Sequence, residues 1–149
     1  RPARQHPERP AMTATLTLRH TFAVPPARIY AAWTDPALFA RWIGPQGISC
    51  TLLDMDPTVG GSFRLDMHLP DRTIHVAGRF IRLQPPNRID LTWGAADGSV
   101  TTDITIHFHP TATGTEMEFH HHLPSPDMVQ SHDDGWTSAF AKLQTLLEP

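Results

Sequence analysis

The sequence predicts an α+β fold: an antiparallel sheet of about seven strands covers one long C-terminal helix, and two short helices follow the first strand. Three observations support this prediction. Residues 125–147 carry apolar side chains at helical spacing. Between residues 48 and 123, polar and apolar side chains mostly alternate, as in half-buried strands. Short turns rich in Pro, Gly and Asn separate these segments, which favours an antiparallel meander.

The C-terminal helix is predicted as a single α-helix over residues 125–147, with Ser125 as its N-cap and Pro126 in its first turn. Gly135 is unusual, because a glycine in mid-helix costs about 1 kcal/mol relative to alanine and yet this one lies on the apolar face. Either a ligand or backbone approaches the helix at Gly135, or the glycine serves ordinary helix–sheet packing. The apolar face consists of Met128, Val129, His132, Gly135, Trp136, Ala139, Phe140, Leu143, Leu146 and Leu147.

The elements before this helix follow from alternation and from prolines. Residues 13–22 alternate as a strand. Pro25 and Pro26 end that strand and begin a helix over residues 27–34, and a second helix covers residues 37–43 until Gly44 and Pro45 end it. Six strands are then predicted over residues 48–55, 62–69, 73–83, 88–93, 100–109 and 115–123. Within them, Gly78 indicates a bulge or a close approach.

Length and charge restrict the protein class. The chain of 149 residues suits one domain, which we assign to residues 13–149. Residues 1–12 are basic and Pro-rich and are expected to form a disordered lead. A net charge of −3 argues against a nucleic-acid partner, and no apolar run approaches the roughly 20 residues of a membrane span. The single cysteine, Cys50, excludes an internal disulfide, and with no secretory signal it indicates a cytoplasmic protein.

Several stretches together resemble the AHSA branch of the START-like, or SRPBCC, superfamily. They are AWTDPALFARWIGPQG (32–47), VGGSFRLDM (59–67), VAGRFIRLQPPNRIDLTW (76–93), the hairpin at 100–122 and HDDGW (132–136). The resemblance implies the helix-grip fold: a curved sheet wrapped around the C-terminal helix, with a cavity between them. Related domains are often dimeric, so a homodimer is expected. The chain departs from the family's usual pair of adjacent tryptophans, because it has Trp42 followed by Ile43.

We expect the protein to bind a small apolar or aromatic molecule between the sheet and the C-terminal helix. Sites for such molecules combine an apolar lining with a few polar groups. No metal or cofactor is predicted. The expected ligand-binding residues are Trp42, Phe63, Leu65, Met67, Val76, Leu91, Trp93, Ile104, Phe119, His121, His132, Trp136 and Phe140.

Two histidines on apolar faces, His121 and His132, are expected to meet inside the cavity. There they act either as satisfied core histidines or as the acid–base group of a cyclase-like or hydrolase-like enzyme. The binding interpretation is preferred over the enzyme, and a stress-related or chaperone-related protein-interaction module is the further alternative. The run 120–122 does not indicate a metal site, because consecutive strand residues point to opposite faces. Folding the last hairpin instead predicts cross-strand pairs on a solvated face: His107 with Glu118, His109 with Glu116, Asp103 with His122 and Thr105 with His120.

Overall fold

The structure is a computed structural model that describes residues 11–149, so most of the expected lead over residues 1–12 lies outside the described residues. The order of elements is the predicted one, and boundaries differ by a residue or two except at the start of the last helix. The elements are β1 (Ala14–Phe22), α1 (Pro26–Thr34), α2 (Pro36–Trp42), β2 (Ser49–Met55), β3 (Ser62–His68), β4 (Thr73–Gln84), β5 (Arg88–Ala95), β6 (Thr101–Pro110), β7 (Thr115–Leu123), a 3₁₀ turn η1 (Pro126–Met128) and α3 (Val129–Leu147).

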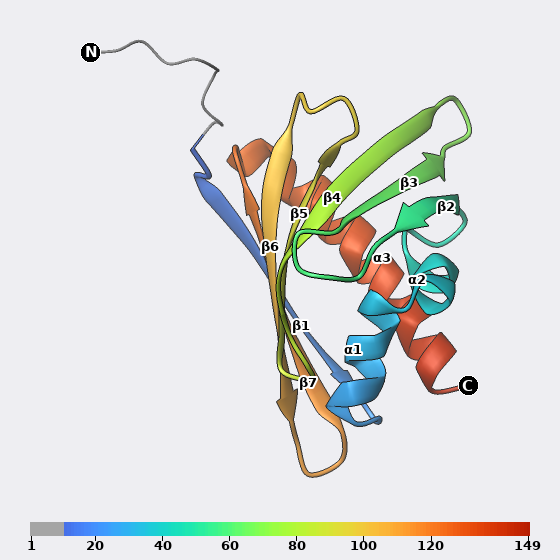
Figure 1. The fold of residues 1–149 in the computed structure, drawn as a ribbon, viewed down its shortest axis with the longest axis vertical. Coiled ribbons are helices and arrows are strands. Elements are labelled where there is room, and N and C mark those ends of the chain that lie inside the picture. Colours follow the sequence, from blue (N-terminus) through green and yellow to red (C-terminus); the bar gives the residue numbers. More distant parts are fainter. Residues whose placement is uncertain (1–10) are drawn as a thin grey trace.

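The strands form one curved antiparallel sheet in the order β1-β7-β6-β5-β4-β3-β2. From β2 to β7 the sheet is the predicted meander, and β1 joins it by pairing with β7 along its whole length. Figure 1 shows the sheet on one side of the molecule and the helices on the other. The predicted helix-grip arrangement is therefore confirmed.

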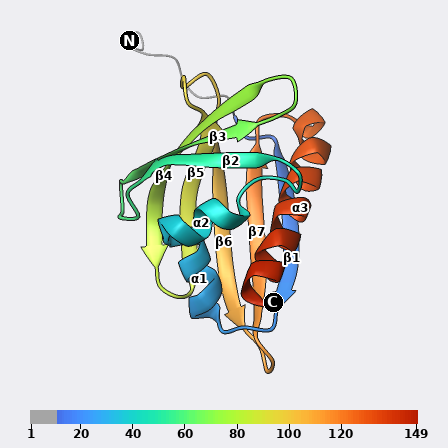
Figure 2. The same ribbon diagram turned by 90° about the vertical axis from the view of Figure 1, so that its right-hand side faces the viewer.

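The concave side of the sheet carries the core. Along β7, burial alternates residue by residue, and the inward side chains include Phe119 and His121. α3 packs over β1, and α1 lies over β6 (Figure 2). Between them, Trp33 contacts Phe119, Trp42 and Phe140 through its ring, so aromatic side chains from four elements meet at one point. Burial of large aromatic rings is the main apolar contribution to such a core.

The C-terminal helix begins differently from the prediction. Residues 126–128 form a 3₁₀ turn, and the α-helix starts at Val129 rather than directly after Ser125. Ser125 does act as an N-cap, since its hydroxyl accepts a hydrogen bond from the Asp127 backbone N–H at 3.2 Å. The Val129 N–H then bonds the Pro126 carbonyl, three residues back. Such tightened turns are frequent at helix ends, and hydrophobic spacing does not distinguish them from α-helix.

Gly78 shows the predicted close approach. A side chain at this position would collide with the Thr92 carbonyl of β5 and with the Phe63 ring of β3. The irregularity in the β4–β5 register lies slightly further on, between Phe80 and Arg82. Glycine at position 78 therefore lets the Phe63 ring lie against the backbone of the sheet.

Candidate functional site

One pocket of about 220 Å³ opens between α3, the loop after α2 and the strands β3 to β5. Its wall is mostly apolar. A second hollow of about 320 Å³ lies beside it and shares Met67, Ile74, Trp93 and His132 with it. The first pocket is lined by Ile43, Gly44, Pro45, Met67, Ile74, Trp93, Ser131, His132, Gly135, Trp136 and Ala139.

The pocket lies at one end of α3 because the two halves of that helix pack differently. We call residues 129–135 the open half and residues 136–147 the closed half. Every fully buried residue of α3 belongs to the closed half: Trp136, Ala139, Phe140, Leu143 and Leu147. In the open half, His132 and Val129 are only half-buried. The sheet therefore grips one half of the helix and leaves a gap beside the other.

The loop after α2 forms one wall of the pocket and is tied to the closed half of α3. The Lys142 ammonium donates to the carbonyls of Ile43 and Gly44, at 3.3 and 3.0 Å. The Ser138 hydroxyl accepts from the Gln46 N–H at 2.7 Å. Gly44 has a φ of +87°, a conformation that favours glycine. These contacts place residues 43–45 opposite Gly135 without filling the space between.

Gly135 forms part of the pocket wall, and packing does not require glycine there. A methyl group at this position would have one neighbouring atom within 4 Å, the Pro45 Cγ at 3.9 Å, which is an ordinary contact distance. In residues 11–149, neither backbone from outside α3 nor a sheet side chain lies within 4 Å of this position. The sequence left open the approach of a ligand or of backbone, and ordinary helix–sheet packing. The approach of a ligand therefore stays as a prediction.

His121 is fully buried and its two ring nitrogens both have partners. The Trp136 indole N–H can only donate, so His121 Nδ1, at 3.1 Å, is the acceptor. The proton therefore lies on Nε2, which donates to the Thr102 hydroxyl at 2.7 Å. That hydroxyl donates in turn to the Trp93 carbonyl at 2.6 Å. This chain of hydrogen bonds links β5, β6, β7 and α3.

These partners keep His121 neutral. Burial, together with repulsion from His132 and His122, lowers the pKa of His121 to about 3. A second proton on Nδ1 would also face the Trp136 N–H, so two donors would meet. His121 therefore has no free nitrogen for proton transfer, and its geometry is that of a satisfied core histidine.

His132 lies beside His121, as the sequence predicts, with ring centroids 5.1 Å apart. Its situation is different, because the ring lines both hollows. Its Nδ1 is 2.7 Å from the Met128 carbonyl. A carbonyl can only accept, so Nδ1 carries the proton and Nε2 presents a lone pair. Nε2 has no hydrogen-bond partner within residues 11–149.

The expected ligand-binding residues separate into two groups. Met67, Trp93, His132 and Trp136 line the first pocket, and Val76 lines the second hollow. The others are buried in the core between the sheet and the helices, and they line neither hollow. They are Trp42, Phe63, Leu65, Leu91, Ile104, Phe119, His121 and Phe140.

Sequence reasoning missed several residues of the pocket, most of which lie outside the sheet. The loop residues 43–45 were predicted only as the end of a helix, and Ile74 lies at the start of β4. Ser131 sits on α3 beside the predicted apolar face, and Ala139 lies on that face but was not among the expected ligand-binding residues. The one signal in the sequence was Gly135, whose position on the apolar face is costly without a reason.

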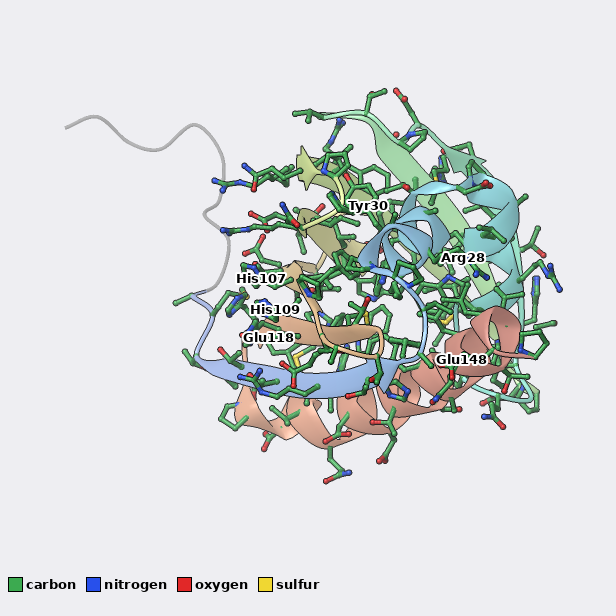
Figure 3. All side chains as sticks on the ribbon, turned by 90° about the horizontal axis from the view of Figure 1, so that it is seen from below. Arg28, Tyr30, His107, His109, Glu118 and Glu148 are labelled. Carbon is green, nitrogen blue, oxygen red and sulfur yellow. The ribbon has the colours of Figure 1, made fainter. Side chains whose placement is uncertain are left out.

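The convex face of the sheet carries the outward-pointing histidines of the last hairpin, whereas His20 faces α3, with its Nε2 2.8 Å from the Gln144 side-chain oxygen. The predicted hairpin register is confirmed, with His107 opposite Glu118 and His109 opposite Glu116. Figure 3 shows His107, His109 and Glu118 together, on the side of the sheet that faces away from the helices. In the part of the chain that the structure describes, no three His, Cys, Asp or Glu side chains are arranged to hold a metal ion.

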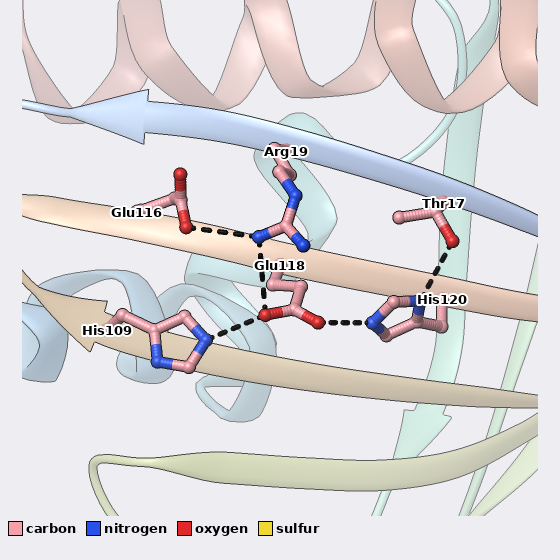
Figure 4. A network of polar contacts seen from close by, with 6 residues as sticks. All are labelled: Thr17, Arg19, His109, Glu116, Glu118 and His120. Atoms are coloured by element: carbon pink, nitrogen blue, oxygen red, sulfur yellow. Dashed lines mark hydrogen bonds and ion pairs between the residues drawn. The ribbon is translucent and has the colours of Figure 1, made fainter.

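Glu118 is the centre of a polar network on this face (Figure 4). It accepts from His120 at 2.6 Å and His109 at 2.8 Å, and Arg19 lies 3.4 Å away. His109 thus bonds Glu118 rather than its register partner Glu116, which pairs with Arg19 at 3.2 Å. The hydrogen bonds from His120 and His109 lower the pKa of Glu118 to about 2. This network is a solvated surface feature, away from the pocket.

Comparison with known proteins gives a family and several similar structures. Residues 23–148 match the family model of the Activator of Hsp90 ATPase homolog 1-like proteins. A solved structure from Chromobacterium violaceum is 28% identical, covers 91% of this chain and 97% of its own, and has a TM-score of 0.82. The AHSA1 protein from Silicibacter pomeroyi is 26% identical over 90% and 97% of the two chains, with a TM-score of 0.79. A solved structure of a protein from Rhodobacter sphaeroides is 27% identical, covers 89% of this chain and 91% of its own, and has a TM-score of 0.75. No curated protein matches the sequence.

Proposed function

The chain belongs to the family of Activator of Hsp90 ATPase homolog 1-like proteins, and on this premise we propose that it binds a small apolar or aromatic molecule in the pocket beside the open half of α3. Apolar lining with a few polar groups is typical of small-molecule sites. The pocket has Trp93 and Trp136 as aromatic wall and His132 as a polar group. Within residues 11–149, no helix is long and apolar enough to cross a membrane.

The observation that carries this proposal is Gly135. A glycine in the middle of a helix costs about 1 kcal/mol, and here no neighbouring atom demands it. Its effect is to enlarge the pocket by the volume of a side chain. A binding site explains why this position stays open, whereas a purely structural helix would be more stable with alanine.

The experiment measures binding of 2-naphthol by isothermal titration calorimetry. We expect binding to the wild type and its loss in Gly135→Leu, because the leucine side chain fills the pocket. Gln130→Leu is a matched control, since Gln130 is exposed on the same half of α3 and lines neither hollow. Absence of binding to the wild type, or unchanged binding to Gly135→Leu, would contradict the proposal. Native mass spectrometry of the same samples reports any co-purified molecule and tests the expected homodimer.

An acid–base enzyme is a second candidate, and the geometry favours His132 over His121 for that role. A general base needs a free lone pair on an oriented ring. The Met128 carbonyl orients the His132 ring and leaves Nε2 free, whereas both nitrogens of His121 are occupied. If the protein is an enzyme, His132→Gln should accumulate substrate, so the molecule that co-purifies with it should differ in mass from that of the wild type. Equal masses would support binding alone.

A further inference from the structure

The polar groups of the pocket are few and their roles differ. Four lining side chains carry a nitrogen or oxygen: Trp93, Ser131, His132 and Trp136. The Trp136 indole N–H already donates to His121 Nδ1 at 3.1 Å. The Ser131 hydroxyl donates to the Met128 carbonyl at 3.3 Å. The Trp93 indole N–H has no hydrogen-bond partner in residues 11–149 and can only donate. His132 Nε2 is therefore the one side-chain nitrogen of the pocket that accepts a hydrogen bond.

The hydrogen bond on the other side of the ring determines what Nε2 can recognise. The Met128 carbonyl holds the proton on Nδ1, so the neutral ring presents only a lone pair at Nε2. The His121 ring packs almost perpendicular to it, at an interplanar angle of 85°. A hydroxyl or N–H group on a ligand matches this lone pair. An ether oxygen at the same place does not, because it also presents lone pairs.

The size and the wall of the pocket indicate the rest of the ligand. An apolar cavity of roughly 150 Å³ holds benzene. At about 220 Å³, this pocket has room for a second fused ring. The rings of Trp93 and Trp136 lie 4.9 Å apart at 61° and provide edge and face contacts for an aromatic molecule.

Resting on the proposed function, we infer that the ligand is a two-ring aromatic molecule whose hydroxyl or N–H group donates a hydrogen bond to His132 Nε2. His132 is then the residue that determines specificity in the pocket, and His121 holds Trp136 in place behind it. When the ligand has no hydrogen-bond donor, His132 Nε2 can accept only from water. One such hydrogen bond is worth about fivefold in affinity.

The test compares two probes that differ only in the donor, 2-naphthol and 2-methoxynaphthalene. Dissociation constants are measured by calorimetry at pH 7.5 on the full chain. For the wild type we expect 2-naphthol to bind about fivefold tighter. His132→Leu replaces the acceptor with an apolar side chain of similar size, so we expect the two probes to bind this variant with equal affinity. His132→Gln restores an acceptor and should recover part of the preference. Ser131→Ala, on the same wall, should retain all of it.

The outcomes separate this inference from the proposal on which it rests. Equal binding of both probes to the wild type, or tighter binding of the ether, overturns the inference and leaves the binding proposal standing. A preference that persists in His132→Leu also overturns it. Failure of both probes to bind the wild type overturns the two together. Because the wild-type comparison needs no variant, the test holds even if a substitution at His132 prevents folding, which circular dichroism would reveal.

Discussion

The two halves of α3 are packed against the same sheet, but only one of them is enclosed. The closed half, residues 136–147, presents Phe140 and Leu143 to the aromatic core and buries both. The open half, residues 129–135, presents Ser131, His132 and Gly135 to a pocket. The difference shows that one amphipathic pattern serves two purposes: large apolar side chains anchor the helix, and small or polar ones on the same face leave room beside it.

The largest effect is expected from loss of an anchor. Phe140→Ala should lower the free energy of unfolding by about 3–5 kcal/mol, and Trp136→Ala by a similar amount, because each removes a buried aromatic ring and leaves a cavity. His132→Ala in the open half should cost less than about 1 kcal/mol, since its ring is half-buried. Urea unfolding curves measure all three. A cost for His132→Ala equal to that of Phe140→Ala would remove the distinction between the halves.

The buried histidine predicts a pH dependence of stability. The pKa of His121 is about 3 in the folded protein and near 6.5 when unfolded. Between these values the unfolded chain takes up a proton that the folded protein does not. Stability is therefore complete above pH 6.5 and falls as the pH is lowered, by up to roughly 1.4 kcal/mol per pH unit. His121→Gln, which does not titrate, should show a shallower slope between pH 6 and 5 in urea unfolding. Equal pH slopes of the unfolding free energy in the wild type and His121→Gln would contradict the conclusion that His121 is buried and neutral.

Gly135→Ala is expected to stabilise the protein. Alanine gains about 1 kcal/mol over glycine in mid-helix, and the added methyl group meets only Pro45 at an ordinary distance. The rise in the free energy of unfolding should be accompanied by weaker binding of 2-naphthol. Gly78→Ala is the contrasting variant, because there the methyl group collides with the Thr92 carbonyl and stability should fall. Destabilisation by Gly135→Ala would mean that packing requires the glycine after all.

The smallest effect is expected on the convex face. Glu118→Gln removes the charge shared by Arg19, His109 and His120, and these contacts are partly exposed to solvent. Its cost should stay below about 1 kcal/mol at neutral pH, with binding in the pocket unchanged. The lowered pKa of Glu118 places any loss of this contribution in acid, below pH 4.5 and towards pH 2. Thermal unfolding at pH 7 and pH 3 measures both.

Most of the architecture followed from periodicity, whereas the site depended on contacts between distant elements. Alternation identified each strand, the hairpin turn set the register that places His107 opposite Glu118, and helical spacing identified α3. The same patterns show only that a residue faces inward. They do not separate Phe119, which is packed in the core, from Trp93, which borders the pocket. Which inward residues border the pocket depends on where the loop after α2 lies. Lys142 holds that loop through hydrogen bonds between residues about a hundred positions apart in the sequence.

The most direct test of the central claim uses the four tryptophans as reporters. Two of them, Trp93 and Trp136, line the pocket, and two others, Trp33 and Trp42, are buried in the core. In ¹H–¹⁵N spectra recorded during titration with 2-naphthol, we predict shifts of the Trp93 and Trp136 indole signals and of the Gly135 amide, while the Trp33 and Trp42 indole signals stay in place. Shifts centred on Trp33 and Trp42, or no shifts at all, would contradict a ligand site beside the open half of α3.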